Sequence, residues 1–270
     1  MEIIEDIEGW RQRFDEWRRG RGAGAAEAGR DVGADYPFVR NRRAPFNPAR
    51  RALPMLNLAL ITSAGAYIDG TPAFGDDSDP SFREIPIEIE RADLRYTARG
   101  YDPAAVQQDM NAQVPVERLL EFENNGIIGQ LNSVFWSFSG FMPDAGLLVD
   151  ELVPKLLERV NRYEVQAALI VPASRLCHQS CALVARALEL AGVPTMMLAV
   201  VRDVVETVRP PRAAFYDGEL GSVAGRPNWP QHQRRILDEA LRWIEPMDQV
   251  GILNLTVELE SQVEKSRGER

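Results

Sequence analysis

Length, composition and charge restrict the function classes before any motif is considered. The chain has 270 residues, of which 45% are apolar and 26% charged, a mixture typical of a globular protein with a buried core. The net charge of −9 argues against a protein that holds nucleic acid or an anionic membrane surface through positive charge. Only two cysteines and two histidines are present, so the chain is not a disulfide scaffold.

No segment of the sequence has the pattern of a targeting signal or of a membrane span. The first 20 residues are charged and lack the apolar stretch of a secretory signal. The most apolar stretches, near 53–61 and 165–173, have the length of strands. We therefore expect a soluble, cytoplasmic protein with reduced thiols that binds neither membranes nor nucleic acid.

The first 52 residues differ in character from the rest of the chain. Trp10, Phe14 and Trp17 recur at helical spacing and predict a short amphipathic helix, and the Gly- and Ala-rich residues 20–33 predict a linker. Acidic residues are interleaved with the arginines, which favours packing on the body or on another subunit over nucleic-acid binding. We divide the chain into an N-terminal helix and linker (1–52), an α/β domain (53–262) and a polar tail (263–270).

The body is predicted to alternate strands and helices. In chain order the pattern predicts a strand at 56–62, a polar loop at 75–86, a weak strand at 91–95, a helix from 115 to 124, a helix at 147–161 that Pro154 kinks or splits, a strand at 165–171, a helix at 177–190, a strand at 195–201, a helix at 230–244 and an edge strand at 250–260. Continuous apolar strands that alternate with helices predict an α/β fold with a mostly parallel sheet and helices on both faces.

Three of the four Cys and His residues lie together, at Cys177, His178 and Cys181. They follow the strand at 165–171 and a short loop, so Cys177 falls in the first turn of a helix, where the helix dipole stabilises a thiolate. Cys181 lies four residues further on and shares its helix face. One thiol would then attack a substrate and the other resolve the product. The alternatives are that the thiols pack as small apolar side chains and that His178 is a structural hydrogen-bonding group rather than an acid.

Two polar segments are candidates to complete a site at that loop. In the acid-rich segment 76–84, Arg83 would suit a substrate carboxylate, or it would fix its own loop. In the segment 109–111, Asp109 and Asn111 would position a small polar substrate. The acidic residues do not have calcium-loop spacing, so no metal site is predicted. No dinucleotide, nucleoside-triphosphate or serine-hydrolase motif is present, so no cofactor is expected beyond an external thiol reductant.

The chain also resembles a known family. The resemblance covers about 38–245 and includes the segments 38–40, 45–46, 62–65, 79–86, 101–102, 109–111, 115–119 and 126–129 and the run LIVPASRLCHQSCALVARALELAGVPT at 169–195. These segments resemble the selenoprotein B family of glycine, sarcosine, betaine and D-proline reductases. The resemblance implies reductive cleavage of a carbon–nitrogen bond: a selenol or thiol attacks the carbon beside an amine, the amine leaves, and the adduct passes to a partner protein. It also implies a separate pyruvoyl-type subunit that handles the amine.

The resemblance assigns family positions to the residues of the cysteine helix. Ser174 stands where family members carry selenocysteine or cysteine, and Cys177 matches the partner cysteine three residues later. We therefore expect a thiol-dependent reductase or lyase that acts on a small amine or amino-acid-like substrate. Its predicted catalytic residues are Cys177, Cys181, Ser174 and His178, and its predicted substrate-binding residues are Arg83, Asp109, Asn111 and Gly65.

Two other functions are weighed against this one. The first is a non-catalytic subunit or binding protein derived from the same family, which Ser174 at the nucleophile position favours. It would bind a partner subunit or a second copy of itself through the N-terminal helix and the C-terminal strand. The second is a two-cysteine racemase, which is disfavoured because two thiols on one helix face cannot flank a carbon from both sides.

Overall fold

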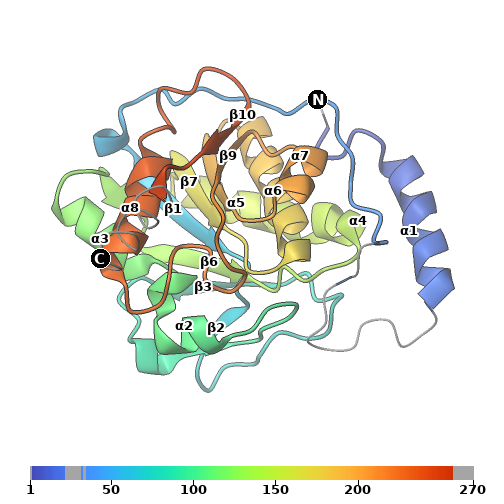
Figure 1. Cartoon of the computed structure of the whole chain (residues 1–270), viewed down its shortest axis with the longest axis horizontal. Helices are drawn as coiled ribbons and strands as arrows, with labels where there is room; N and C mark the ends of the chain where they lie inside the picture. Colours follow the sequence, from blue (N-terminus) through green and yellow to red (C-terminus); the bar gives the residue numbers. More distant parts are fainter. Residues whose placement is uncertain (1, 22–31, 33–34, 258–270) are drawn as a thin grey trace, which may run out of the picture.

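The computed structural model describes residues 2–21, 32 and 35–257 and shows an α/β fold around one large sheet (Figure 1). The sheet has the order β10-β9-β8-β7-β1-β6-β3, and β5 pairs with the start of β1. All of its strand pairs are parallel except β3 with β6. The strands are β1 (Asn57–Thr62), β3 (Phe82–Pro86), β5 (Gln130–Leu131), β6 (Val134–Phe138), β7 (Ala167–Val171), β8 (Thr195–Ala199), β9 (Arg212–Phe215) and β10 (Gly251–Asn254).

Helices cover both faces of the sheet, as the alternation of strands and helices predicts. They are α1 (Ile7–Arg21), α2 (Ala104–Gln108), α3 (Val116–Asn124), α4 (Ala145–Leu147), α5 (Val153–Arg162), α6 (Arg175–Leu190), α7 (Arg202–Val208) and α8 (Pro230–Leu241), with short 3₁₀ turns η1 (Leu53–Met55), η2 (Arg91–Asp93) and η3 (Met110–Ala112). Neighbouring residues of β1 point to opposite faces: Ile61 packs in the cluster with α1, α5, α6 and α7, and Leu60 in the cluster with α3 and α8.

The strand order places a switch point between β1 and β7. After β1 the chain forms β3 and later β6 on one side of β1, and then passes to β7, β8, β9 and β10 on the other side. The connections that leave β1 and β7 therefore diverge at the carboxyl ends of two adjacent strands, where ligands of open α/β sheets bind. A two-stranded antiparallel sheet, β2 (Ala66–Ile68) with β4 (Leu94–Tyr96), follows β1 at this end.

Several elements differ from the sequence prediction. Strands β6 and β9 and helices α2 and α7 were not predicted. The weak strand expected at 91–95 is the turn η2 followed by β4, and the edge strand expected at 250–260 is β10, which ends at Asn254. The expected loop 75–86 ends in strand β3, which forms the sheet edge and whose register with β6 runs from Phe82↔Phe138 to Pro86↔Val134. An edge position tolerates Pro86, which has no N–H to donate. The helix predicted at 147–161 is interrupted as expected at Pro154: α4 leads through η4 (Leu148–Leu152), a π-helical turn, into α5. The wider turn accommodates the proline ring and the missing N–H without ending the helix.

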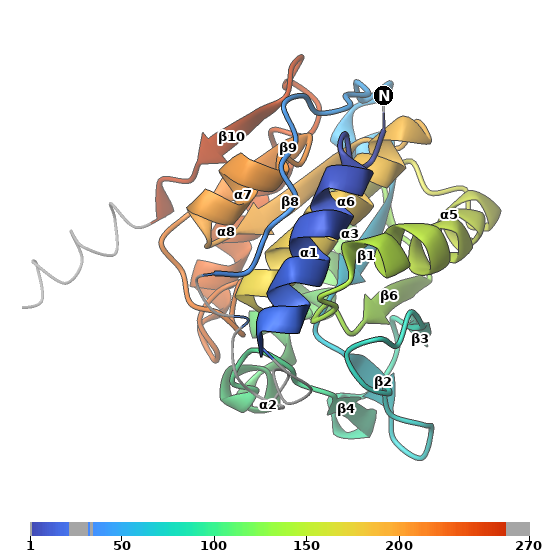
Figure 2. The same ribbon diagram turned by 90° about the vertical axis from the view of Figure 1, so that its right-hand side faces the viewer.

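The N-terminal segment packs on the body. Trp10 and Phe14 are buried in the same apolar cluster as residues of α5 and α6, and α1 crosses over α6 in Figure 2. Trp10 donates its indole N–H to the carbonyl of Pro37 at 2.8 Å. The helix expected in 1–52 is thus present, whereas most of the linker at 20–33 and the whole polar tail 263–270 lie outside the described residues. Of the helices described, none is long and apolar enough to cross a membrane.

A buried ion pair fixes the segment that follows. Arg212 of β9 pairs with Glu189 of α6, and both side chains are inaccessible to solvent. Glu189 also accepts from the backbone N–H of Asn47 at 2.5 Å and of Thr195 at 2.8 Å. Arg212 additionally lies over the ring of Phe46 at 4.1 Å. One carboxylate therefore joins α6, β8, β9 and the segment near residue 47.

Removing this carboxylate should be costly. In Glu189→Ala the guanidinium of Arg212 remains buried without its counter-charge, so we expect a loss of about 3–5 kcal/mol in the free energy of unfolding, measured by urea titration. The matched control is Glu206→Ala, which breaks an exposed pair with Arg202 and should cost less than about 1 kcal/mol. Equal losses in the two variants would contradict the role given to the buried pair.

Candidate functional site

The ends of β1 and β7 are joined directly to each other. The N–H of Ser63, the residue after β1, donates to the carbonyl of Val171 at 3.2 Å. The hydroxyl of Ser63 accepts from the N–H of Ala173 at 3.0 Å. These bonds fix the loop that leads from β7 into α6, and so they position the first turn of that helix.

Ser174 is the N-cap of α6. Its backbone is extended (φ −128°, ψ 176°), and its hydroxyl accepts from the N–H of Cys177 at 3.1 Å. The side chain is fully buried. The hydroxyl at the position that the resemblance assigns to the nucleophile thus satisfies a free N–H of the helix.

Cys177 lies at the switch point, as the sequence predicts for a residue of the first helical turn. Its side chain is 1% exposed, and its Sγ lies 3.9 Å from the carbonyl of Ser63. Gly140 packs against it so closely that a Cβ at this position would be 3.0 Å from Sγ and 2.3 Å from the Cβ of Ser63. Burial raises the pKa of the Cys177 thiol, whereas hydrogen bonds from Ser174 and Ser63 act in the opposite direction.

Residues 97–102, which we call the cover segment, close the site from the side of β2 and β4. The Tyr101 hydroxyl donates to the carbonyl of Ala64 at 2.7 Å. Gly100 (φ +70°) approaches Ser174, and a Cβ there would lie 2.5 Å from the Phe141 ring. At Gly65 (φ +65°) a Cβ would lie 2.5 Å from the carbonyl of Thr97. Both positions have a positive φ and no room for a Cβ, so glycine is required there.

The second thiol is deeper in the structure. Cys181 is fully buried in the apolar cluster on the α1 side of the sheet, and burial raises its pKa well above the ordinary value. Ser63 hydrogen-bonds this thiol as well, and the charge of Cys177 would further disfavour a second thiolate. Both thiols therefore meet the same serine at the end of β1.

His178 is held by two backbone groups. Its Nε2 accepts from the N–H of Val200 at 3.1 Å, so the proton is on Nδ1, which donates to the carbonyl of Ser174 at 2.6 Å. Burial lowers the pKa of His178 to about 4. The imidazole is neutral at physiological pH and ties α6 to the end of β8, which is the structural alternative raised by the sequence.

The predicted substrate-binding side chains are engaged elsewhere. Arg83 donates to Ser81 at 2.9 Å and to the carbonyls of Phe82, Pro72 and Ala73, and lies over the Phe74 ring at 4.3 Å. It therefore fixes the loop before β3. Ser63, Gly65 and Cys177 meet at the switch point, but Arg83 makes none of its hydrogen bonds with them.

Asp109 and Asn111 form a second polar cluster around η3. Asp109 accepts from the N–H groups of Asn111 and Asn228 and from the amide of Gln233 at 2.6 Å. Asn111 donates to Glu117 at 2.7 Å. Hydrogen bonding outweighs partial burial and lowers the pKa of Asp109, so this carboxylate is ionised. The cluster joins η3 and α3 to the loop before α8.

Comparison with known proteins identifies the family. The model of the glycine/sarcosine/betaine reductase selenoprotein B family matches residues 27–172, which is more than half of the chain and ends just before the loop of Ser174. The chain belongs to this family. No solved structure matches it.

Relatives of this selenoprotein B family member are reductase subunits. It is 29% identical to the D-proline reductase subunit gamma of Acetoanaerobium sticklandii, over 76% of this chain and 85% of that protein. It is 27% identical to the glycine reductase complex component B subunit gamma of Symbiobacterium thermophilum, over 75% of this chain and 49% of that protein. It is 26% identical to the sarcosine reductase complex component B subunit beta of Peptoclostridium acidaminophilum, over 64% of this chain and 41% of that protein. The chain thus spans less than half of the last two relatives.

Sequence reasoning missed Ser63, Tyr101 and Gly140. Ser63 had one usable signal, because it directly follows a buried strand of the expected parallel sheet. Gly140 and Tyr101 meet the thiol region through contacts over 37 residues or more of sequence, which no local pattern reports. In this family member they shape the site as much as the cysteine helix does.

The neutral buried His178 predicts an acid-sensitive fold. Its pKa is about 4 when folded and about 6.5 when unfolded, so the stability it contributes is complete above pH 6.5 and falls as pH drops toward 4. The expected loss is about 3 kcal/mol over this range. Urea titrations at pH 7 and 4.5 should show a smaller loss in His178→Gln. The pKa of His232 is also lowered to about 4, so His232→Gln should reduce the acid sensitivity in the same direction, and the double variant should reduce it further. An unchanged slope in His178→Gln would contradict this account.

The role of Ser63 is tested by thiol titration. Ser63→Ala removes a hydrogen bond that lowers the thiol pKa, so the midpoint of Cys177 alkylation by iodoacetamide should move to higher pH. The measurement uses a Cys181→Ala background and mass spectrometry. Ser139→Ala is the control: this serine is also buried at the end of a strand, and its hydroxyl has no hydrogen bond within the described residues. A midpoint that does not move in Ser63→Ala would exclude this role.

Proposed function

We propose that this selenoprotein B family member is a reductase subunit in which Cys177 has taken over the reaction of the family's chalcogen. Its substrate is a small amine or amino-acid-like molecule whose carbon–nitrogen bond is cleaved. The relatives' names associate them with D-proline, glycine and sarcosine, so these and related amines are the first candidates. The complexes named for the relatives also support the presence of partner subunits.

One observation carries this proposal: Cys177, rather than Ser174, has a side chain available to react at the switch point. The Ser174 hydroxyl already accepts from the Cys177 N–H as the helix cap. A serine hydroxyl also needs a base for activation, and the adjacent His178 uses both ring nitrogens on backbone groups. The thiol of Cys177 stands at the positive end of a 16-residue helix, beside the hydroxyl of Ser63.

The reaction begins with an open cover segment. While Tyr101 is bound to Ala64, the thiol is dry and its pKa is raised, so it is protonated and protected. When the cover segment moves, water and substrate reach Cys177 and the desolvation penalty falls. The helix N-terminus and Ser63 remain in place, and both now favour the thiolate.

The bond changes balance with one external reductant. The Cys177 thiolate attacks the carbon that bears the amine, a carbon–sulfur bond forms, and the carbon–nitrogen bond breaks with its electron pair on the departing amine. An external thiolate then attacks the sulfur of the adduct. The carbon leaves with the electron pair, takes a proton, and the two sulfurs end as a disulfide. A carboxylate or carbonyl beside that carbon makes it a better leaving group.

A non-catalytic subunit is the second candidate. The full burial of both thiols and the capping role of Ser174 favour it, because no reacting group is exposed in the closed structure. In this case the chain would contribute surface rather than chemistry to a reductase complex.

Adduct formation separates the two candidates. Betaine is the sharpest probe, because its quaternary amine is already a charged leaving group and needs no second subunit to activate it. The protein is incubated with betaine, without reductant, at pH 8. Intact-protein mass spectrometry should show a carboxymethyl group on Cys177, with one trimethylamine released per adduct.

The controls assign the sulfur. Cys181→Ala should form the adduct, Cys177→Ala should not, and Ser174→Ala should still form it while losing about 1 kcal/mol of stability with its helix cap. An adduct that survives Cys177→Ala, or no adduct with betaine, glycine, sarcosine or D-proline when partner subunits and a thiol are added, would favour the non-catalytic subunit.

A further inference from the structure

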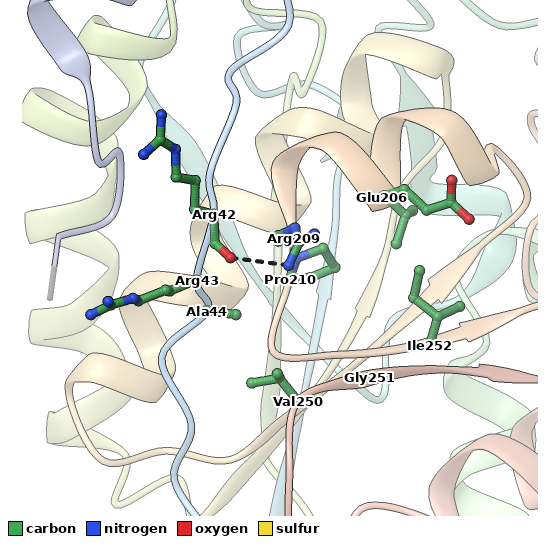
Figure 3. Close-up of a pocket in the computed structure, with 10 residues that line it drawn as sticks. Arg42, Arg43, Ala44, Glu206, Arg209, Pro210, Val250, Gly251 and Ile252 are labelled. Carbon is green, nitrogen blue, oxygen red and sulfur yellow. Dashed lines mark hydrogen bonds between the residues drawn. The ribbon is translucent and has the colours of Figure 1, made fainter.

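A groove lies between residues 42–44, the end of α7 and the start of β10, and none of its lining residues belongs to the thiol site. It has a volume of about 560 Å³ and is lined by residues 42–44, by 205–206 and 209–210 around the end of α7, and by 250–252 at the start of β10. Figure 3 shows residues 42–44 on one side and Val250 and Ile252 on the other, with the Arg209 guanidinium donating to the carbonyl of Arg42 between them. Aliphatic side chains form much of its surface, and Val250 is 42% exposed.

The segment beside the groove is strongly basic although the protein is acidic. Residues 40–51, the arginine segment, contain five arginines and no acidic residue, in a chain of net charge −9. These arginines, all exposed, are Arg40, Arg42, Arg43, Arg50 and Arg51. In the described part of the chain none of them forms an ion pair, whereas many other arginines do, among them Arg11, Arg95, Arg175 and Arg234. The Glu5 carboxylate accepts from the backbone N–H groups of Arg42 and Arg43 and offsets part of this charge, and the segment keeps a positive excess.

The other wall of the groove is β10, whose outer edge pairs with no other strand among the described residues. β10 is the last strand of the sheet, and it pairs with β9 through the N–H of Gly251 to Pro211 and of Leu255 to Phe215. In a parallel pair alternate residues face the neighbour, so the N–H and C=O of Ile252 and Asn254 face outward. An exposed edge of this kind accepts an extended chain as a further strand.

We propose that the groove binds an extended acidic segment of a partner polypeptide, which adds as a strand to β10 and pairs its carboxylates with Arg42 and Arg43 of the arginine segment. Apolar side chains of the segment would contact Val205, Pro210 and Ile252. A single small anion fits less well, because Figure 3 shows the guanidinium groups of Arg42 and Arg43 directed away from Val250 and Ile252, so they do not converge on one point. An extended segment meets such groups one after another.

The binding surface continues toward the thiol end of the molecule. A second cavity, of about 420 Å³, is lined by residues 36–41 with Arg175 and α7, and it shares Glu206 and Arg209 with the groove. Arg175 is the first residue of α6, two positions before Cys177. A partner anchored at β10 would thus also reach the surface near the first turn of α6. This inference does not depend on the reactivity of Cys177.

A random-peptide selection tests the chemistry of the occupant directly. A library of displayed twelve-residue peptides is selected on the full chain at low salt, and bound peptides are measured by fluorescence anisotropy. We expect enrichment of sequences that alternate acidic and apolar residues, with affinity that falls steeply with added salt. No enrichment, or enrichment without acidic residues, would overturn the proposal.

Matched variants locate the site. Arg42→Glu/Arg43→Glu should weaken peptide binding about tenfold or more, whereas Arg50→Glu/Arg51→Glu changes the charge equally outside the groove and should weaken it less than about threefold. Ile252→Pro removes an outward N–H without touching the β9 ladder and should also weaken binding, with thermal unfolding confirming that each variant is folded. If both double-arginine variants lost the same peptide affinity, net charge alone would explain the binding, and the groove would be rejected as the site.

The other occupants give distinct results. A second copy of the chain would appear in sedimentation as a dimer that Arg42→Glu/Arg43→Glu dissociates. Inorganic phosphate that binds by calorimetry and is displaced by no selected peptide would indicate a small-anion site. Either result would show that the groove binds something other than an acidic segment, and would overturn the proposal.

Discussion

The structure depends on the short distance between the ends of β1 and β7. At this point the chain must turn in opposite directions from two adjacent strands, and Ser63 joins them through its N–H and its hydroxyl. The loop after β7 is held so that Ser174 can cap α6 and Cys177 can sit in the first turn. The sheet order thus creates the site, and one serine fixes its geometry.

The same constraint makes the site crowded. The backbone around the thiol comes so close that Gly65, Gly100 and Gly140 have no room for a Cβ. Close packing excludes water, and exclusion of water raises the pKa of both thiols. Two effects therefore oppose each other at Cys177: burial favours the protonated thiol, and the hydrogen bonds from Ser174 and Ser63 favour the thiolate. The hydrogen bond from Tyr101 to Ala64 holds the cover segment over this end of β1.

Hydrophobic patterns in the sequence predicted the strands and helices whose formation depends mainly on neighbouring residues. The apolar runs at β1, β7 and β8 and the helical spacing of α6 and α8 were sufficient for the α/β fold, because buried parallel strands read as continuous apolar segments. The π-helical turn before Pro154 follows from the proline itself. The edge strand β3 was missed because its residues, FREIP, lack alternation and follow a turn-rich loop. Its pairing with β6 is set by tertiary context.

The candidate site was predictable only in part, because some of its contacts come from residues that are distant in the sequence. A cysteine in the first turn of a helix after a buried strand can be located by sequence alone, but its burial cannot. The cover segment and Gly140 reach Cys177 from distant parts of the chain. Arg83 and Asp109 have the chemistry of ligand-binding groups, yet their hydrogen bonds are made with neighbouring loops. Residue type shows what a side chain can bind, and only the fold shows what it already binds.

The charged residues form two groups, those that pair with each other inside the protein and those that are exposed on its surface. Glu189 and Arg212 neutralise each other in the interior and hold the middle of the arginine segment against the body through Asn47. Arg186, also buried, donates to the carbonyls of Arg43 and Arg209 and so fixes the backbone on both sides of the groove. Buried charges thus orient a stretch of backbone that carries five exposed arginines and, near Arg42 and Arg43, the carboxylate of Glu5. The exposed guanidinium groups repel one another, and an acidic segment of a partner would reduce this repulsion. The backbone of the arginine segment is already fixed by the buried charges, so binding would require little rearrangement of it.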